Sequence, residues 1–324
     1  MNNSIFVVAE CFKEKLSDIT FEMLGRAKEL AMEFNAKLCA VILGKSVRHY
    51  AEQLGIADEV ILLQNDLLAE FNPEAYRIAL TELLKEKQPM CTFIGLTSSG
   101  IDIAAPLSAE LNFPLVSYCK ELRKEGMALI AVSQLYGGKM FLETEIPKKS
   151  AIISFLPGAF KKENGRAEKS VPIVDFPLQS DLQNLFTTFV QYIEPESGDV
   201  DITQIPVLVS IGRGIQNKEN VSIAQELADI LGGAVSASRP VVDQGWLPVT
   251  RQVGRSGMSV KPKLYLALGI SGAPEHIEGI RNAEMTIAIN TDANAPIFSV
   301  AQYGICGDIL DLIPLLTERL KSKN

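Results

Sequence analysis

The sequence contains few of the residues on which hydrolytic, metal and iron–sulfur chemistry depends. It has only two histidines, His49 and His276, and its five cysteines form no CxxC pair. It also lacks a GxSxG elbow, an HExxH motif and a P-loop. Metal sites need clustered ligands, and hydrolases need a nucleophile beside a base. The sequence therefore predicts no metal site and no catalytic residue of its own, which is typical of a protein that holds a cofactor.

Long apolar runs and an excess of positive charge are also absent. No run approaches the roughly 20 residues that span a bilayer, and the N-terminal run is too short for a signal peptide. An odd number of cysteines without a signal peptide fits a reducing compartment. These features together predict a cytoplasmic protein without stable membrane insertion. The net charge of −8 lies entirely in the first 205 residues, because the rest carries 11 Lys/Arg and 11 Asp/Glu. An acidic surface argues against a nucleic-acid partner.

The first part of the chain alternates short apolar runs with helical patterns. This alternation predicts an α/β domain over residues 1–194, with a mainly parallel sheet and helices on both faces. The pattern changes near Val116, where two strand-like runs flank the turn Tyr136-Gly137-Gly138. We expect a solvated loop at Lys161–Lys169 and an extended segment at Phe186–Ile193. The expected strands are Ile5–Ala9, Leu38–Leu43, Val60–Leu63, Thr92–Leu96, Ala128–Val132 and Lys139–Glu145. The expected helices are Phe21–Phe34, Pro73–Lys87 and Ile101–Leu111.

Residues 195–205 are polar and acidic without apolar periodicity, so we expect an interdomain linker there. A second α/β domain, with a mainly parallel sheet and a Rossmann-like fold, is expected over residues 206–324. Its expected strands are Pro206–Ile211, Ala234–Ala237, Leu264–Ile270 and Met285–Ile289. Its expected helices are Lys218–Leu231, Glu275–Asn282 and Asp308–Leu320. One further apolar run is Ile297–Ala301.

Polar, glycine-bearing turns follow the apolar runs of this second domain. Gly212-Arg213-Gly214 lies between a strand and a helix, where backbone N–H groups and a guanidinium suit a phosphate. Arg239 ends another strand-like run, at a place suited to stacking on a flat ring. Ligands of such sheets bind beyond the carboxyl ends of the strands. The turns therefore predict one pocket for an anionic ligand.

Each of these residues also has a purely structural interpretation. Arg213 suits an exposed position on a tight turn, and Arg239 suits a surface ion pair with Asp243. A single histidine such as His276 is more often structural than functional. Asn290 suits the cap of the turn that follows it. These alternatives stay open when each residue is considered alone.

Taken together, the turns resemble a known family. The sequence VSIGRGIQNKEN, SASRPVVDQGW, RQVGRSG, LALGISGAPEHIEGI and AINTDANAPIFSVAQYGICGD resembles the alpha subunit of electron transfer flavoprotein, in order and spacing. The first domain is similar more loosely, through IFVVAE, TSSGIDIAAPLSAEL and LYGGKM. The resemblance implies an FAD-binding subunit that pairs with a beta subunit.

The resemblance also implies roles for individual residues. Arg213 would face the FAD diphosphate, Arg239 would lie over the isoalloxazine, His276 would lie near its O2 side, and Asn290 and Asp308 would hold the adenosine end. The whole implied FAD site comprises Arg213, Ser238, Arg239, Gln252, Val253, Gly254, Arg255, Ser256, Ser271, Gly272, Ala273, Pro274, Glu275, His276, Asn290 and Asp308.

One turn departs from the commonest family pattern. Many members carry Gln-Thr where Arg255-Ser256 stands here. The hydroxyl of Ser256 retains the capacity to donate to N5 of the ring. Arg255 would add positive charge near a ring that becomes anionic on reduction, provided that its side chain points inward.

The resemblance leaves the electron partners open. One alternative is simple transfer from a dehydrogenase such as an acyl-CoA dehydrogenase. Another is an NADH-oxidising, bifurcating complex that also reduces ferredoxin or flavodoxin, in which the beta subunit carries a second FAD in place of AMP. Two further classes compete with the family, a Rossmann-type NAD(P) oxidoreductase and a nucleotide-binding sensory module. The missing GxGxxG motif argues against the oxidoreductase.

Overall fold

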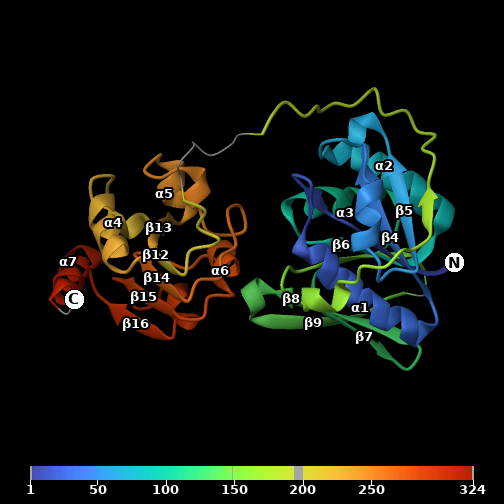
Figure 1. The fold of residues 1–324 in the computed structure, drawn as a ribbon. Helices are drawn as coiled ribbons and strands as arrows, with labels where there is room; N and C mark the ends of the chain where they lie inside the picture. Colours follow the sequence, from blue (N-terminus) through green and yellow to red (C-terminus); the bar gives the residue numbers. More distant parts are fainter. Residues whose placement is uncertain (1, 148, 193–199, 323–324) are drawn as a thin grey trace. The chain divides into compact units, whose positions relative to one another are not determined.

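The computed structural model describes residues 2–147, 149–192 and 200–322, and they form two compact units, Met1–Gln191 and Tyr192–Asn324. Each unit contains its own sheet and its own core, and each is described here by itself (Figure 1). Among the described residues, every helix is too short or too polar to cross a membrane. The predicted boundaries at 194 and 206 stay predictions, and residues 195–199 of the predicted linker lie outside the described residues.

Unit 1 is built on a mixed sheet of nine strands in the order β11-β5-β4-β1-β6-β10-β7-β8-β9. Neighbours from β11 to β7 pair in parallel, and β7, β8 and β9 pair antiparallel. The strands are β1 (Asn2–Val8), β4 (Lys37–Gly44), β5 (Glu59–Gln64), β6 (Pro89–Gly95), β7 (Leu115–Glu125), β8 (Ala128–Leu135), β9 (Met140–Glu145), β10 (Ala151–Phe155) and β11 (Ile173–Asp175). A short hairpin of β2 (Cys11–Phe12) and β3 (Lys15–Leu16) follows β1.

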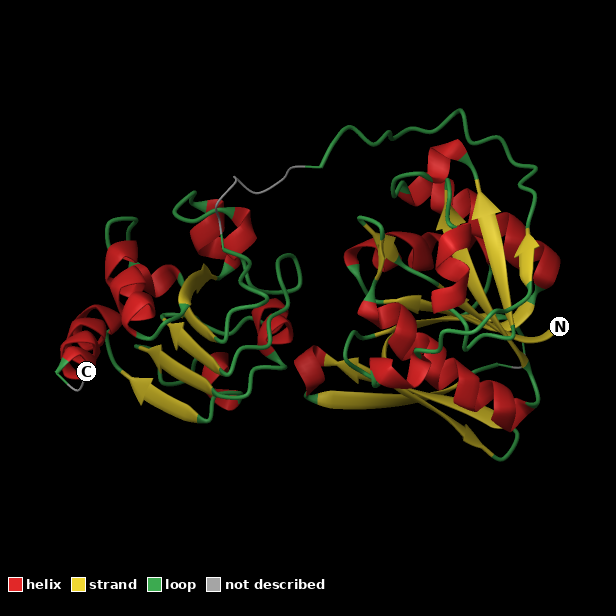
Figure 2. Cartoon of the chain, in the orientation of Figure 1, coloured by secondary structure: helices red, strands yellow, loops and turns green. Residues whose placement is uncertain are grey.

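Helices cover both faces of this sheet (Figures 1 and 2). Ile5 and Val7 of β1 pack on the face of α1 (Asp18–Phe34), while Phe6 and Val8 pack on the face of α2 (Pro73–Lys87) and α3 (Ser98–Leu111). This alternation follows from the period of two along a strand. Helix α2 begins where Asn72 accepts hydrogen bonds from the N–H groups of Glu74 and Ala75, with proline at its first position.

Unit 2 contains a fully parallel sheet of five strands in the order β13-β12-β14-β15-β16. In chain order this is 2-1-3-4-5, a doubly wound arrangement whose switch point lies between β12 and β14. The strands are β12 (Val207–Ile211), β13 (Ala234–Ala237), β14 (Leu264–Leu268), β15 (Thr286–Asn290) and β16 (Tyr303–Cys306). The helices are α4 (Val221–Ile230), α5 (Arg239–Asp243), α6 (Pro274–Ile280) and α7 (Ile309–Lys321).

The two faces of the second sheet have different coverings. Val209 and Ile211 of β12 share a core with α4 and α7, and Leu208 and Tyr265 share the opposite core with Ile280 of α6. Ile202 is buried in this second core, so the packing of unit 2 begins ahead of residue 206.

The structure confirms the two α/β domains and most of the predicted strands and helices. Strands β7, β10, β11 and β16 were not predicted, and the run 297–301 begins in a 3-10 helix, Pro296–Ser299, ahead of β16. No described residue of 186–192 belongs to a strand, and residue 193 lies outside the described part. The loop expected to be solvated at 161–169 is anchored by buried Gly165, which packs against the backbone of Phe21 in α1.

Candidate functional site: a cavity at the carboxyl ends of five strands

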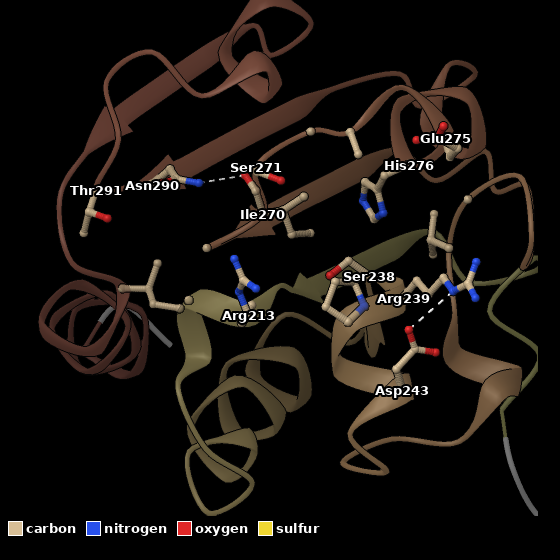
Figure 3. Close-up of a pocket in the computed structure, with 18 of the residues that line it drawn as sticks. Arg213, Ser238, Arg239, Asp243, Ile270, Ser271, Glu275, His276, Asn290 and Thr291 are labelled. Carbon is tan, nitrogen blue, oxygen red and sulfur yellow. Dashed lines mark hydrogen bonds and ion pairs between the residues drawn. The ribbon is translucent and has the colours of Figure 1, made fainter.

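A cavity of about 680 Å³ lies at the carboxyl edge of the second sheet (Figure 3). Residues that follow each of the five strands line it, including Arg213 after β12, Ser238 after β13, Ile270 after β14, Thr291 after β15 and Asp308 after β16. Its volume is within the range of pockets that hold organic cofactors. The doubly wound strand order explains its location, since the loops diverge at the switch point.

The backbone at the switch point is closely packed. Gly212 follows β12 and donates its N–H to the carbonyl of Leu268, while a Cβ added at Gly212 would lie 2.2 Å from the carbonyl oxygen of Gly269. A side chain at residue 212 would therefore separate the two strands. Beside this contact, Arg213 and Gly214 reach the cavity, and Arg213 is exposed.

Arg239 begins helix α5 at the cavity wall and makes an ion pair with Asp243, with Nε 3.4 Å from Oδ2 (Figure 3). Both side chains are more than half exposed, so solvent weakens this pair. The surface ion pair expected as the structural alternative is therefore present. Because the pair is weak and lies on the cavity wall, Arg239 can exchange it for contact with a ligand.

The turn after the 3-10 helix Val249–Arg251 contributes Val253, Gly254, Arg255 and Ser256 to the cavity. The backbone fixes its position, because the N–H of Val253 bonds to Ala237 and the N–H of Arg255 bonds to Glu275. Gln252 does not line the cavity. It is buried and donates from Nε2 to Oγ of Ser256 at 3.0 Å.

His276 lies on α6, and its ring lines the cavity although the residue is only 5% exposed (Figure 3). Nε2 is 2.8 Å from the hydroxyl of Tyr265. Burial lowers the pKa of His276 to about 4, with a partly opposing contribution from the backbone of Val253. The imidazole is therefore neutral at physiological pH. Its Nδ1 is buried and has no hydrogen-bond partner of normal geometry among the described residues.

Asn290 and Asp308 lie at the end of the cavity beside β15 and β16. Asn290 donates from Nδ2 to the carbonyl of Ile270 and accepts from the N–H of Asp292, so the expected turn cap is present. Asp308 caps α7 by accepting from the N–H of Leu310. Both side chains thus have structural partners and still line the cavity.

The cavity brings together all of the predicted site residues except Gln252 and Pro274. The roles assigned to them by resemblance stay predictions. Nine further lining residues were not included in the prediction; six are glycine, proline or isoleucine, whose side chains carry little chemical signal, and Gln216, Asp243 and Thr291 are polar residues that the prediction missed. The nine are Gly214, Gln216, Pro240, Asp243, Gly269, Ile270, Thr291, Gly307 and Ile309.

The lining suits FAD in three respects. Guanidiniums of Arg213, Arg239 and Arg255 complement phosphates and a ring that gains negative charge. Apolar side chains offer contact to a flat ring system. Nδ1 of buried His276 has no hydrogen-bond partner of normal geometry among the described residues, so a polar group of a ligand would stabilise it, because an unpaired buried polar atom is unfavourable. No group of acidic, histidine or cysteine side chains suited to a metal occurs in the part of the chain that the structure describes.

Comparison with known proteins gives the same assignment. Residues 201–281 match the model of the electron transfer flavoprotein FAD-binding domain, and residues 5–181 match that of the electron transfer flavoprotein domain. The chain belongs to the electron transfer flavoprotein alpha-subunit family. The alpha subunit of Thermoanaerobacterium thermosaccharolyticum is 34% identical over 98% of this chain and 97% of its own length. "Protein FixB" of Clostridium saccharobutylicum is also 34% identical, over 98% and 96%.

Membership of the electron transfer flavoprotein family establishes three properties that the sequence predicted. The chain is an alpha subunit, it binds FAD through its C-terminal domain, and it carries electrons. The family also implies a partner subunit, since its members are named as subunits. This assignment supersedes the alternatives of a Rossmann-type oxidoreductase and a sensory module.

Proposed function

We propose that this subunit pairs with a beta subunit in the cytoplasm and passes electrons between a dehydrogenase and a second redox protein. FAD supplies the redox chemistry. The observation that carries the proposal is the cavity in unit 2, whose lining combines three arginines with a neutral, partly unsatisfied histidine. Such a site binds an anionic cofactor and favours the extra negative charge of reduction.

Residues at different positions in the cavity bind different parts of FAD. Arg213 binds the diphosphate, and Asn290 and Asp308 hold the adenosine end. Arg239, Arg255 and Ser256 surround the ring together with His276, and Ser238 and Ser271 offer additional hydroxyls on the wall. Each of these groups orients the cofactor or stabilises charge on it, and none needs to form a covalent bond.

An acyl-CoA dehydrogenase is the electron donor that we propose. A similar protein, 31% identical over 98% of this chain and 95% of its own length, is named "Acryloyl-CoA reductase electron transfer subunit beta" in Anaerotignum propionicum. That name links a relative to electron transfer in a reaction of an acyl-CoA. A mixture of the FAD-bound heterodimer with candidate dehydrogenases and their substrates should bleach the flavin absorbance for the true donor only.

The second candidate function is electron bifurcation from NADH to ferredoxin or flavodoxin. Arg255 supports it, since a cation that lines the cavity would raise the potential of FAD bound to unit 2. The number of flavins in the purified heterodimer distinguishes the two functions. Two FAD per heterodimer and NADH oxidation indicate bifurcation, whereas one FAD with AMP indicates simple transfer. A heterodimer that takes up no FAD would contradict both.

A further inference from the structure

A row of buried polar groups lies directly beneath the cavity. Ser210 of β12 and Tyr265 of β14 lie on the same face of the sheet, the one that packs against α6 and His276. The hydroxyl of Tyr265 is 2.6 Å from Oγ of Ser210 and 2.8 Å from Nε2 of His276. Ser210 and Tyr265 are fully buried. Tyr265 thus connects the interior of the sheet to a side chain of the cavity wall.

Two arrangements of protons fit this row. In the first, Ser210 donates to Tyr265, Tyr265 donates to Nε2 of His276, and the imidazole proton is on Nδ1. In the second, every bond is reversed: Nε2–H donates to Tyr265, and Tyr265 donates to Ser210. A phenol has one proton, so it donates to one neighbour only.

The first arrangement satisfies more of the buried groups. It leaves one proton without an acceptor, on Nδ1 at the cavity wall. The second leaves the Ser210 proton without an acceptor inside the sheet and Nδ1 without a donor as well, because Ser210 has no other hydrogen bond among the described residues. Each unsatisfied buried group costs about 1–3 kcal/mol. The first arrangement is therefore the more stable one.

Both titratable groups of the row are uncharged, as the two arrangements require. Burial raises the pKa of Tyr265 and lowers that of His276 to about 4, so both groups are neutral at physiological pH. Hydroxyls of Ser210 and its cross-strand neighbour Ser236 partly oppose the rise in the pKa of Tyr265.

We propose that Tyr265 is a positioning residue that holds His276 as a neutral imidazole with its proton on Nδ1, so that the cavity wall presents an N–H donor to an oxygen or nitrogen acceptor of the FAD ring. This inference rests on the proposed FAD site and adds a residue that does not touch the cavity. A neutral donor stabilises negative charge on the ring without the pH dependence of an ordinary histidine.

The tautomer is measurable in the FAD-bound heterodimer with ¹⁵N-labelled histidine, because protonated and unprotonated ring nitrogens differ in chemical shift. His276→Gln removes the signal of interest and so assigns it. We expect protonated Nδ1 and unprotonated Nε2 in the wild type. Protonated Nε2 in an FAD-bound sample would overturn the inference and leave the FAD site intact. A sample without FAD would contradict the proposed function instead.

Two variants that each lack one hydroxyl, Ser210→Ala and Tyr265→Phe, distinguish the two proton arrangements. Ser210→Ala should keep the proton on Nδ1, because Tyr265 still donates to His276. Under the reversed arrangement it would free the tyrosine proton and change the tautomer. Tyr265→Phe should populate the Nε2–H form and decrease the equilibrium constant for the first reduction of FAD by up to tenfold, or about 59 mV.

Thr317→Val is the control, since it deletes a buried hydroxyl of unit 2 that has no hydrogen-bond partner of normal geometry among the described residues and does not act on Tyr265. It should leave both the tautomer and the potential unchanged. A potential that shifts equally in Thr317→Val and Tyr265→Phe would reduce Tyr265 to a packing role and overturn the inference. If Tyr265→Phe fails to fold, the wild-type tautomer and Ser210→Ala still decide the question.

Discussion

Gln252 and Ser256 form a hydrogen bond across the turn at the cavity, with Nε2 of Gln252 donating to Oγ of Ser256 at 3.0 Å. Gln252 is buried, whereas Ser256 lines the cavity. Because the amide occupies a lone pair of the hydroxyl, the Ser256 proton is directed elsewhere. Gln252, which does not line the cavity, therefore determines the direction in which the Ser256 hydroxyl donates.

Gln252→Ala should decrease the one-electron reduction potential of bound FAD by about 30–60 mV, because a hydrogen bond contributes about 0.5–1.5 kcal/mol and tenfold corresponds to about 59 mV. Ser256→Ala should have at least the same effect. The two changes together should not add, since both remove one interaction. Redox titration of the three variants checks this, and additive shifts would show that Gln252 acts by another route.

Arg239→Ala should also decrease this potential and weaken FAD binding, because it removes a cation from the cavity wall. Asp243→Asn is the matched control. It breaks the ion pair but keeps the guanidinium, so the potential should hold or rise. Potentiometry with an FAD-binding titration tests both. An unchanged potential in Arg239→Ala would exclude a position over the ring.

Arg255→Gln removes the guanidinium from the cavity wall and keeps a polar side chain there. If the guanidinium stabilises the reduced ring by about 1–2 kcal/mol, the variant should decrease the potential by roughly 40–90 mV. The shift should become smaller at high salt, since screening weakens the interaction of partly exposed charges. A shift that does not respond to salt would point to a change of geometry instead of charge.

The neutral His276 gives unit 2 a defined response to acid. An unfolded chain binds the histidine proton near pH 6.5, but the folded chain does so only near pH 4. The free energy of unfolding should therefore decrease by about 3 kcal/mol between these values and not further below them. Urea unfolding followed by the fluorescence of Trp246, the only tryptophan, measures it.

His276→Gln is the reference for this experiment, because other groups titrate as well. Burial raises the pKa of Glu10 and Glu22 in unit 1, so their effect on stability has the opposite sign. The difference between wild type and His276→Gln isolates the histidine. Parallel curves for the two proteins would mean that His276 is protonated in the folded state.

Gly272 has a left-handed backbone conformation with φ of +82°, and an added Cβ would lie 2.4 Å from the backbone nitrogen of Ile297. Gly272→Ala should decrease the free energy of unfolding by more than about 2 kcal/mol and decrease FAD affinity. Gly232 has φ of +64° with open space around it, so Gly232→Ala should cost only about 1 kcal/mol. Equal losses in the two variants would exclude the steric explanation.

The sequence was sufficient where structure depends on local signals. The bounds of α2 agree with the prediction because proline and a capping asparagine mark its start and α2 ends before Gln88, which has a left-handed conformation. The polar turns were identifiable because each follows an apolar strand. Strand β16 was not predicted, since all four of its residues are exposed and it pairs only with β15. The role of Tyr265 depends on Ser210, which lies 55 residues away, so no local pattern reveals it.

Every residue that lines the cavity lies between 213 and 309, within unit 2. The lining of this cavity is thus built from a single unit of the chain. The rate of electron delivery then depends on how closely a partner protein can approach the mouth of the cavity, and this approach can change during evolution without altering the residues that set the potential.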